Sequence, residues 1–209
     1  MAHPGAHAGP VLRAIGRAYL AAFGWTVSPG TPNAAKAIFV AAPHTSNWDL
    51  PFTLAICWAL DMKVNWLGKT SLFRAPFGGI MRALGGIPID RTKRLSQVES
   101  VAESIAAREK IFLIIAPAGT RSKRDHWKSG FYRIAEAANV PMIFGFLDYA
   151  KKTGGLGPVF IPTGNVRADM DRIREFYANV TGKFPEQASI PRLLEEDAAE
   201  SAAARPAES

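Results

Sequence analysis

The feature that most constrains the fold is the alternation of short, largely apolar runs with segments of helical periodicity. The apolar runs are residues 38–42, 64–67, 111–115 and 140–147, and the helical segments are 11–25, 50–60, 95–109, 129–139 and 168–181. Runs that are apolar throughout are typical of strands buried on both faces, as in parallel sheets. The alternation predicts one α/β domain, whose largely parallel or mixed central sheet is flanked by helices.

Charge divides the chain into a basic body and an acidic end. The net charge is +7, but residues 193–209 carry a net −4, which leaves residues 1–192 at +11. We expect three segments: an N-terminal tail and amphipathic helix (1–25), the main domain (26–192) and a flexible acidic tail (193–209). The basic body favours an anionic partner, which could be a nucleic acid, a membrane surface or a phosphorylated substrate.

The segment 11–25 combines apolar residues at helical spacing with Arg13 and Arg17. This pattern fits a helix lying in a membrane interface and equally a helix packed on the core of the domain. No apolar run reaches the roughly 20 residues that span a bilayer, and no signal peptide is evident. We therefore expect a cytoplasmic protein. The single cysteine, Cys57, excludes an internal disulfide.

A histidine and an aspartate five residues apart, His44 and Asp49, follow the first apolar run. Within one helix they would point about 140° apart, so they can meet only if His44 precedes the helix and Asp49 lies in its first turn. A capping-box-like start at Ser46 would allow this arrangement. A histidine oriented by a carboxylate is a general base. Alternatively, Asp49 only complements the helix dipole.

Two further loops carry groups that could bind anions. Arg91 follows the short run 87–89, and the segment 117–124 contains Gly119, Thr120, Arg121 and further bases. An arginine at a strand end can hold a phosphate with two hydrogen bonds, and a glycine-rich turn can offer backbone N–H groups. The alternatives are a surface ion pair at Arg91 and a solvated basic turn. No cluster of side chains indicates a metal site.

Four segments in this order resemble the glycerolipid acyltransferases, the family of 1-acylglycerol-3-phosphate acyltransferase. Residues 44–49 match its HxxxxD motif, 86–91 are similar to its second block, 117–122 to its P-E-G-T-R-S block and 140–143 to its fourth block. The resemblance covers roughly residues 36–165 and implies a glycerol-3-phosphate acyltransferase-like fold. The sequence departs from the pattern at Ala118, where the family usually has glutamate.

The resemblance implies an O-acyltransferase of phospholipid biosynthesis. In this interpretation His44 and Asp49 are catalytic, and Arg91, Gly119, Thr120 and Arg121 bind the acceptor. The donor is acyl-CoA or acyl carrier protein, and no cofactor is implied. The acceptor is a lysolipid, foremost 1-acylglycerol-3-phosphate, in an anionic membrane that the protein contacts peripherally on its inner face.

Two other interpretations remain open. The acceptor could be another lyso-lipid or a glycolipid, or the protein could be a catalytically silent module that binds lipid or acyl-CoA. A nucleic-acid partner is not expected, because the aromatic residues lie within apolar runs and no binding motif is present. The side chains of Phe52, Trp66, Leu72 and Phe77 could line an acyl groove, or pack in the core.

Overall fold

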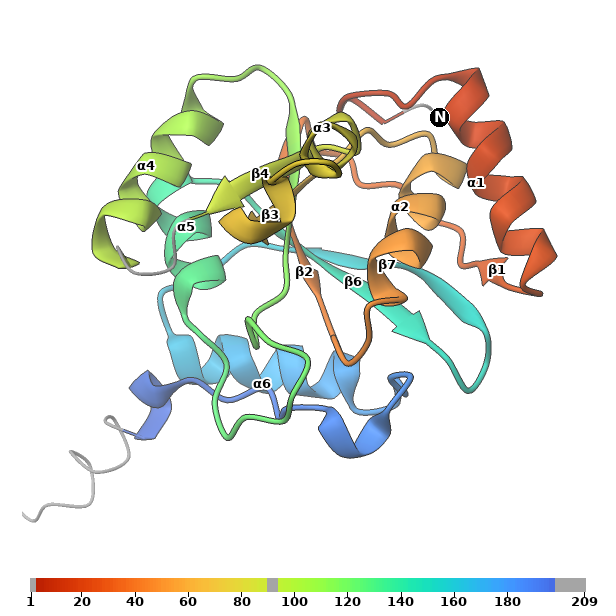
Figure 1. Ribbon diagram of the computed structural model, residues 1–209. Helices are drawn as coiled ribbons and strands as arrows, with labels where there is room; N and C mark the ends of the chain where they lie inside the picture. The colour runs from red at the N-terminus through yellow and green to blue at the C-terminus, as the bar shows by residue number, and fades with distance from the viewer. Residues whose placement is uncertain (1–2, 90–93, 198–209) are drawn as a thin grey trace, which may run out of the picture.

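The computed structural model describes residues 3–89 and 94–197 and contains a seven-stranded sheet with the order β1-β7-β6-β2-β5-β3-β4 (Figure 1). Its strands are β1 (Thr26–Val27), β2 (Lys36–Ala41), β3 (Asn65–Lys69), β4 (Gly86–Ile89), β5 (Ile111–Ile115), β6 (Met142–Asp148) and β7 (Thr153–Phe160). All neighbouring pairs are parallel except β6 and β7, which are antiparallel. The predicted fold class, an α/β domain with a mixed sheet, is confirmed.

Helices cover both faces of this sheet. They are α1 (Pro10–Ala22), α2 (Asp49–Ala59), α3 (Gly78–Ala83), α4 (Arg94–Ala106), α5 (Gly130–Ala138) and α6 (Val166–Tyr177), with short 3-10 turns η1 (Thr70–Phe73) and η2 (Pro185–Gln187). In Figure 1, α1 and α2 lie to the right of the sheet, α4 and α5 to the left, and α6 below.

The apolar runs bury both of their faces, as their composition predicts. In β2, Ile38 and Val40 pack in the cluster that includes residues of α5 and α6, whereas Ala37 and Phe39 pack in the cluster that includes residues of α2. Successive side chains of a strand point to opposite faces, so a run without polar residues fills two cores. A third cluster joins α1 to α2 around Leu20 and Phe52.

The structure departs from the predicted elements in four places. Strand β7 (Thr153–Phe160) lies outside the apolar runs named above, and η1 and α3 lie outside the helical segments named there. Residues 3–9 are packed rather than loose: His3 is buried, and His7 forms a bridge with Met62. The predicted flexible tail begins too early, because residues 193–197 belong to the fold and include the buried Glu196.

Candidate active site

Strand β2 and helix α2 bring His44 and Asp49 together. The chain leaves β2 at Ala41, and α2 begins at Asp49 itself, so His44 lies in the connecting loop. The Nδ1 atom of His44 is 2.9 Å from Oδ2 of Asp49. The predicted pairing is confirmed. Trp48, not Ser46, is the N-cap residue, but Asp49 accepts the backbone N–H of Ser46, as one half of the predicted capping box requires.

The Asp49 carboxylate accepts hydrogen bonds from backbone N–H groups of the loop that precedes α2. Its Oδ2 accepts the backbone N–H groups of Thr45 (2.8 Å) and Ser46 (2.9 Å) as well as His44 Nδ1. Its Oδ1 accepts the hydroxyl of Tyr149 at 2.8 Å. The Asp49 residue is only 4% exposed, so these four donors enclose the carboxylate.

This contact determines which nitrogen of His44 is available for chemistry. A neutral imidazole that donates from Nδ1 to Asp49 keeps the lone pair on Nε2. The His44 side chain is 28% exposed, and His44 lines a pocket. The arrangement can therefore accept a proton from a hydroxyl in the pocket and stabilise the resulting imidazolium through Asp49.

The loop after β5 places Arg121 at the same pocket. Gly119 has φ +66°, a left-handed conformation that glycine adopts without steric cost. Arg121 then donates from Nη1 to the side-chain oxygen of Asn47. Asn47 lies in the loop between β2 and α2, residues 42–48, which we call the histidine loop. Gly119, Thr120 and Arg121, the residues predicted to bind the acceptor, all line the pocket. Arg91, the remaining predicted site residue, lies outside the described residues.

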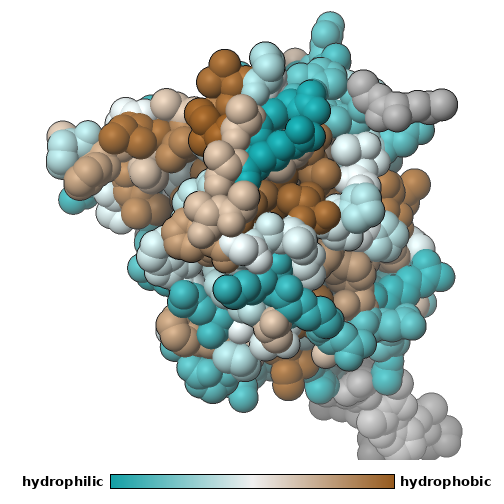
Figure 2. All heavy atoms as spheres, turned by 90° about the vertical axis from the view of Figure 1, so that its right-hand side faces the viewer, coloured by the Kyte–Doolittle hydropathy of each residue, from teal (hydrophilic) through white to brown (hydrophobic). Residues whose placement is uncertain are grey.

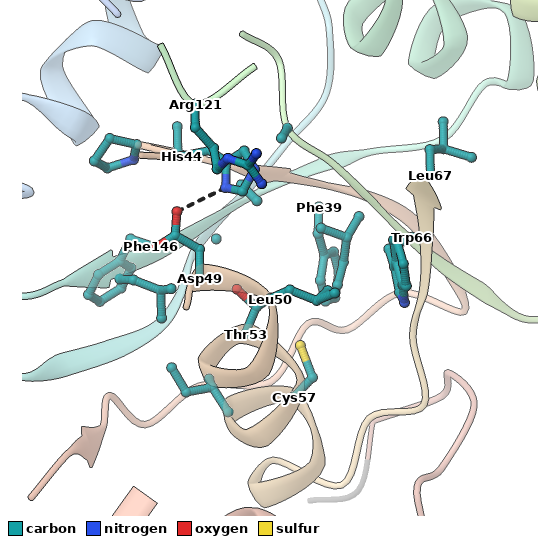
Figure 3. Close-up of a pocket in the computed structure, with 18 of the residues that line it drawn as sticks. Phe39, His44, Asp49, Leu50, Thr53, Cys57, Trp66, Leu67, Arg121 and Phe146 are labelled. Atoms are coloured by element: carbon teal, nitrogen blue, oxygen red, sulfur yellow. Dashed lines mark hydrogen bonds and ion pairs between the residues drawn. The ribbon is translucent and has the colours of Figure 1, made fainter. Parts of the chain in front are cut away.

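The pocket runs from these polar groups into the apolar interior between α2 and the sheet. Its volume is about 330 Å³. In Figure 3, His44 and Arg121 lie at one end, whereas Trp66 and Cys57 lie away from them. Of the four proposed groove residues, Trp66 and Leu72 line the pocket; Phe52 packs against α1 instead, and Phe77 is exposed.

Cys57 is a passive part of this pocket wall. The residue is 2% exposed, and burial raises the pKa of its thiol to about 12. A thiol with this pKa remains protonated at neutral pH and is a poor nucleophile. The pocket therefore offers His44 as its base and no activated cysteine.

Sequence analysis missed the C-terminal segment that joins the two polar loops, residues 181–197, which we call the C-terminal strap. Its Phe184 N–H donates to Thr45 Oγ1 at 3.2 Å, and the amide nitrogen of Gln187, turned toward the loops, reaches the carbonyls of Arg121 (2.9 Å) and Thr45 (3.3 Å). Ser189 accepts the N–H of Arg124 at 2.9 Å. The strap therefore links the histidine loop to the loop between β5 and α5, residues 116–129, which we call the arginine loop.

Tyr149 was also missed, although its position in the sheet could have identified it as a candidate site residue. It follows Asp148, the last residue of β6, and so lies at the carboxyl end of a strand that pairs with β2. Loops at these ends carry the chemistry of α/β proteins. A single tyrosine at the end of a strand matches no local motif, so only this positional rule could have drawn attention to it.

Comparison with known proteins gives the family. The model of the family described as Acyltransferase matches residues 27–144, which is more than half of the chain. The chain belongs to this acyltransferase family. The family resemblance noted in the sequence is therefore confirmed, and the protein is an acyltransferase enzyme.

A solved structure confirms the fold. The 1-acyl-sn-glycerophosphate (LPA) acyltransferase PlsC from Thermotoga maritima aligns with a TM-score of 0.55 over 79% of this chain and 76% of that chain, at 16% sequence identity. No curated protein matches the sequence.

Two further findings concern the membrane and metals. Within residues 3–89 and 94–197, no helix is both long and apolar enough to cross a bilayer. The same part of the chain contains no group of three or more His, Cys, Asp or Glu side chains placed to hold a metal ion.

Proposed function

We propose that this acyltransferase moves a fatty acyl group from acyl-CoA or acyl carrier protein to the hydroxyl of a lysophospholipid, with 1-acylglycerol-3-phosphate as the acceptor. One observation carries the proposal. The His44–Asp49 pair lies in a deep apolar pocket that Arg121 also lines. A base, a cation and an apolar cavity match the reacting hydroxyl, the phosphate and the acyl chain of such a substrate pair.

In the reaction, Nε2 of His44 removes the proton of the acceptor hydroxyl as its oxygen attacks the thioester carbonyl. The new C–O bond forms, the C–S bond breaks, and the thiolate leaves with the proton that the imidazolium returns. Asp49 holds the ring and stabilises its transient positive charge. The chemistry requires no resident cofactor and no covalent enzyme intermediate.

The acceptor's phosphate is held by the arginine loop. Arg121 supplies a planar guanidinium suited to a phosphate, and Thr120 adds a hydroxyl donor, whereas the Gly119 N–H already donates to the carbonyl of Ala116 at 3.0 Å. Arg91 is proposed to contribute a second cation, in keeping with the family resemblance. Holding the phosphate at this loop places the acceptor hydroxyl beside His44, which converts a bimolecular encounter into a positioned one.

Helix α1 supports peripheral contact with an anionic membrane surface. One face of α1 packs on α2: Leu20 is buried, and a Cβ at Gly16 would lie 2.5 Å from the carbonyl oxygen of Ala55. The other face leaves Val11 and Ile15 70% and 49% exposed. Hydrophobic surface also gathers on the face in Figure 2, which is the side of the molecule that carries α1. We propose contact with the inner face of the membrane, whose anionic lipids would attract the basic body of residues 1–192.

The test is transfer of a labelled acyl chain to a panel of lysolipids, with acyl-CoA and acyl carrier protein as alternative donors. Lysophosphatidate heads the panel, and a lyso-aminolipid and a glycolipid complete it. We expect product from lysophosphatidate with the wild type and none above background with His44→Ala.

The chain supplies a matched control for this substitution. His7 Nδ1 lies 2.9 Å from Asp61 Oδ2, the same pair of atoms at the same distance, just beyond the other end of α2. His7→Ala should keep wild-type turnover. Product only from another acceptor would reassign the substrate, and no product from any donor and acceptor, with lipid binding retained, would favour the silent binding module.

A further inference from the structure

The carboxylate of Asp49 has two oxygens with different tasks. Oδ2 faces His44 and also accepts two backbone N–H groups, whereas Oδ1 accepts a single bond, from the Tyr149 hydroxyl at 2.8 Å. Tyr149 lies outside the residues that the family model matches. The dyad of His44 and Asp49 is therefore extended by a third side chain that contacts Asp49 on the side away from the imidazole.

The hydroxyl of Tyr149 is the donor in this contact. Burial raises the pKa of Tyr149 well above its ordinary value of 10, and the negative charge of Asp49 and the hydrogen bond to it raise it further. The phenol therefore keeps its proton throughout the pH range in which enzymes work. A hydrogen bond donated to an ionised carboxylate is charge-assisted and stronger than a neutral one.

The ring of Tyr149 is held so that its hydroxyl points to Asp49. Trp25 contacts it edge-on with ring centroids 4.9 Å apart, and Phe52 does so at 6.0 Å. The Tyr149 N–H donates to the carbonyl of Thr181 at 2.9 Å, which fixes the backbone at the start of the C-terminal strap. These contacts explain why the hydroxyl is positioned without help from substrate.

We propose that Tyr149 is a positioning residue that sets the proton affinity of His44 through Asp49. A hydrogen bond donated to Oδ1 draws negative charge away from Oδ2, so the carboxylate stabilises an imidazolium less strongly. Removing the hydroxyl concentrates the charge on Oδ2 and makes His44 more basic. The inference rests on the proposed role of His44 as the base.

The charged and titratable groups near Tyr149 are few within the described part of the chain. Lys183 of the strap lies over its ring at 5.6 Å, Arg121 reaches the histidine loop through Asn47, and Tyr19 of α1 adds a weak influence. Replacing Tyr149 by phenylalanine leaves all three in place. A change in the titration of His44 would therefore report on the missing hydroxyl.

The experiment is a histidine NMR titration of the free protein, with the His44 signal assigned by its absence in His44→Gln. Tyr149→Phe should raise the titration midpoint of His44 by about half to one pH unit. The acid limb of the rate profile should move upward in parallel, so that activity well below the midpoint falls by up to about tenfold, while the KM for the acceptor stays unchanged.

Tyr132→Phe is the matched control, because its hydroxyl donates to another buried aspartate, Asp169, at 2.7 Å. It should destabilise the fold to a similar degree and leave the His44 midpoint unchanged. A His44 midpoint in Tyr149→Phe that is unchanged, or lower, would overturn the proposal. So would an equal rise in Tyr132→Phe.

A second variant covers the case in which Tyr149→Phe does not fold. A 3-fluorotyrosine placed at position 149 keeps the shape of the side chain but is a stronger donor, so it should lower the midpoint, and a rise or no change would overturn the proposal. The titration needs no substrate. Absence of turnover with every acceptor would therefore contradict the proposed function alone, while the titration would still decide the role of Tyr149.

Discussion

Replacing Asp49 by asparagine should separate the catalytic role of this side chain from its structural one. Asparagine can direct its oxygen to the three donors that Oδ2 now accepts, from His44, Thr45 and Ser46. Its amide nitrogen then faces the Tyr149 hydroxyl, which can turn to accept. The Tyr149 O–H then loses the acceptor it has in Asp49 Oδ1, so we expect the free energy of unfolding to fall by about 1–3 kcal/mol while the protein stays folded.

The loss in rate can be worked from the geometry. At the 2.9 Å that separates His44 Nδ1 from Asp49 Oδ2, a carboxylate attracts an imidazolium by about 6 kcal/mol at an effective dielectric constant of about 20. The His44 side chain is 28% exposed, and solvent screening reduces this attraction to about 4 kcal/mol. The positive charge on His44 develops only as the hydroxyl loses its proton. The value of kcat should therefore fall about a thousandfold.

The assay pairs acyl transfer with urea denaturation, and Asp61→Asn is its control. Asp61 likewise accepts a histidine, His7, at 2.9 Å and a backbone N–H, that of Gly9, at 3.0 Å. Asp61 has φ +64°, which asparagine tolerates. Asp61→Asn should therefore be folded and fully active. An Asp49→Asn variant that is folded and keeps more than a tenth of the wild-type kcat would refute the assigned role of Asp49.

Three other variants or conditions test separate parts of the structure. Cys57 is the only cysteine, is 2% exposed and has a thiol pKa of about 12. In the folded protein it should react with maleimide at pH 8 far more slowly than in urea, and more slowly still when a long-chain acyl-CoA is bound. A reaction rate equal to that in urea would contradict the buried pocket. Ala118→Glu puts a carboxylate into the apolar cluster that contains Trp127, so urea denaturation should show a loss of more than about 2 kcal/mol, and a smaller loss would contradict that burial. The hydrogen bond from His126 holds the pKa of Asp197 below its ordinary value of 3.8. This carboxylate therefore stabilises the fold at pH values above 3.8 and stops doing so as the pH falls through its lower folded-state pKa. The Asp197→Asn variant should accordingly have a lower Tm than the wild type at pH 6 and an equal Tm in strong acid, and a difference that persists in strong acid would contradict the ionic role.

The sequence predicted the strands of the sheet that are buried on both faces. Apolar runs predicted β2, β5 and β6, because a strand buried on both faces needs no polar residue. Strand β7 was largely missed because the segment 153–160 contains three glycines and a proline, which are depleted in strands. A Cβ at Gly154 would lie 2.3 Å from the side chain of Ile56 in α2, and one at Gly155 would lie 2.7 Å from the Cβ of Ser28, so both positions leave no room for a side chain.

Contacts between segments far apart in the chain could not be read from the residues alone. The pair of His44 and Asp49 is local, five residues apart, and was predicted correctly. Tyr149 reaches Asp49 across 100 residues, and Phe184 reaches Thr45 across 139. Such contacts depend on where the sheet order and the C-terminal strap place each loop, and no local pattern encodes that placement.

The strap also explains how the arginine loop keeps its shape with alanine at position 118. The side chain of Ala118 is buried in the apolar cluster with Trp127 and Leu193, so this position stabilises the loop by packing, not by accepting hydrogen bonds. The backbone supplies the polar ties instead: Lys128 N–H donates to the carbonyl of Pro117 at 3.0 Å, and Trp127 N–H donates to the strap carbonyl of Arg192 at 2.7 Å. Because these ties come from main-chain groups and the strap, a carboxylate at position 118 is not needed to present Arg121 to the pocket.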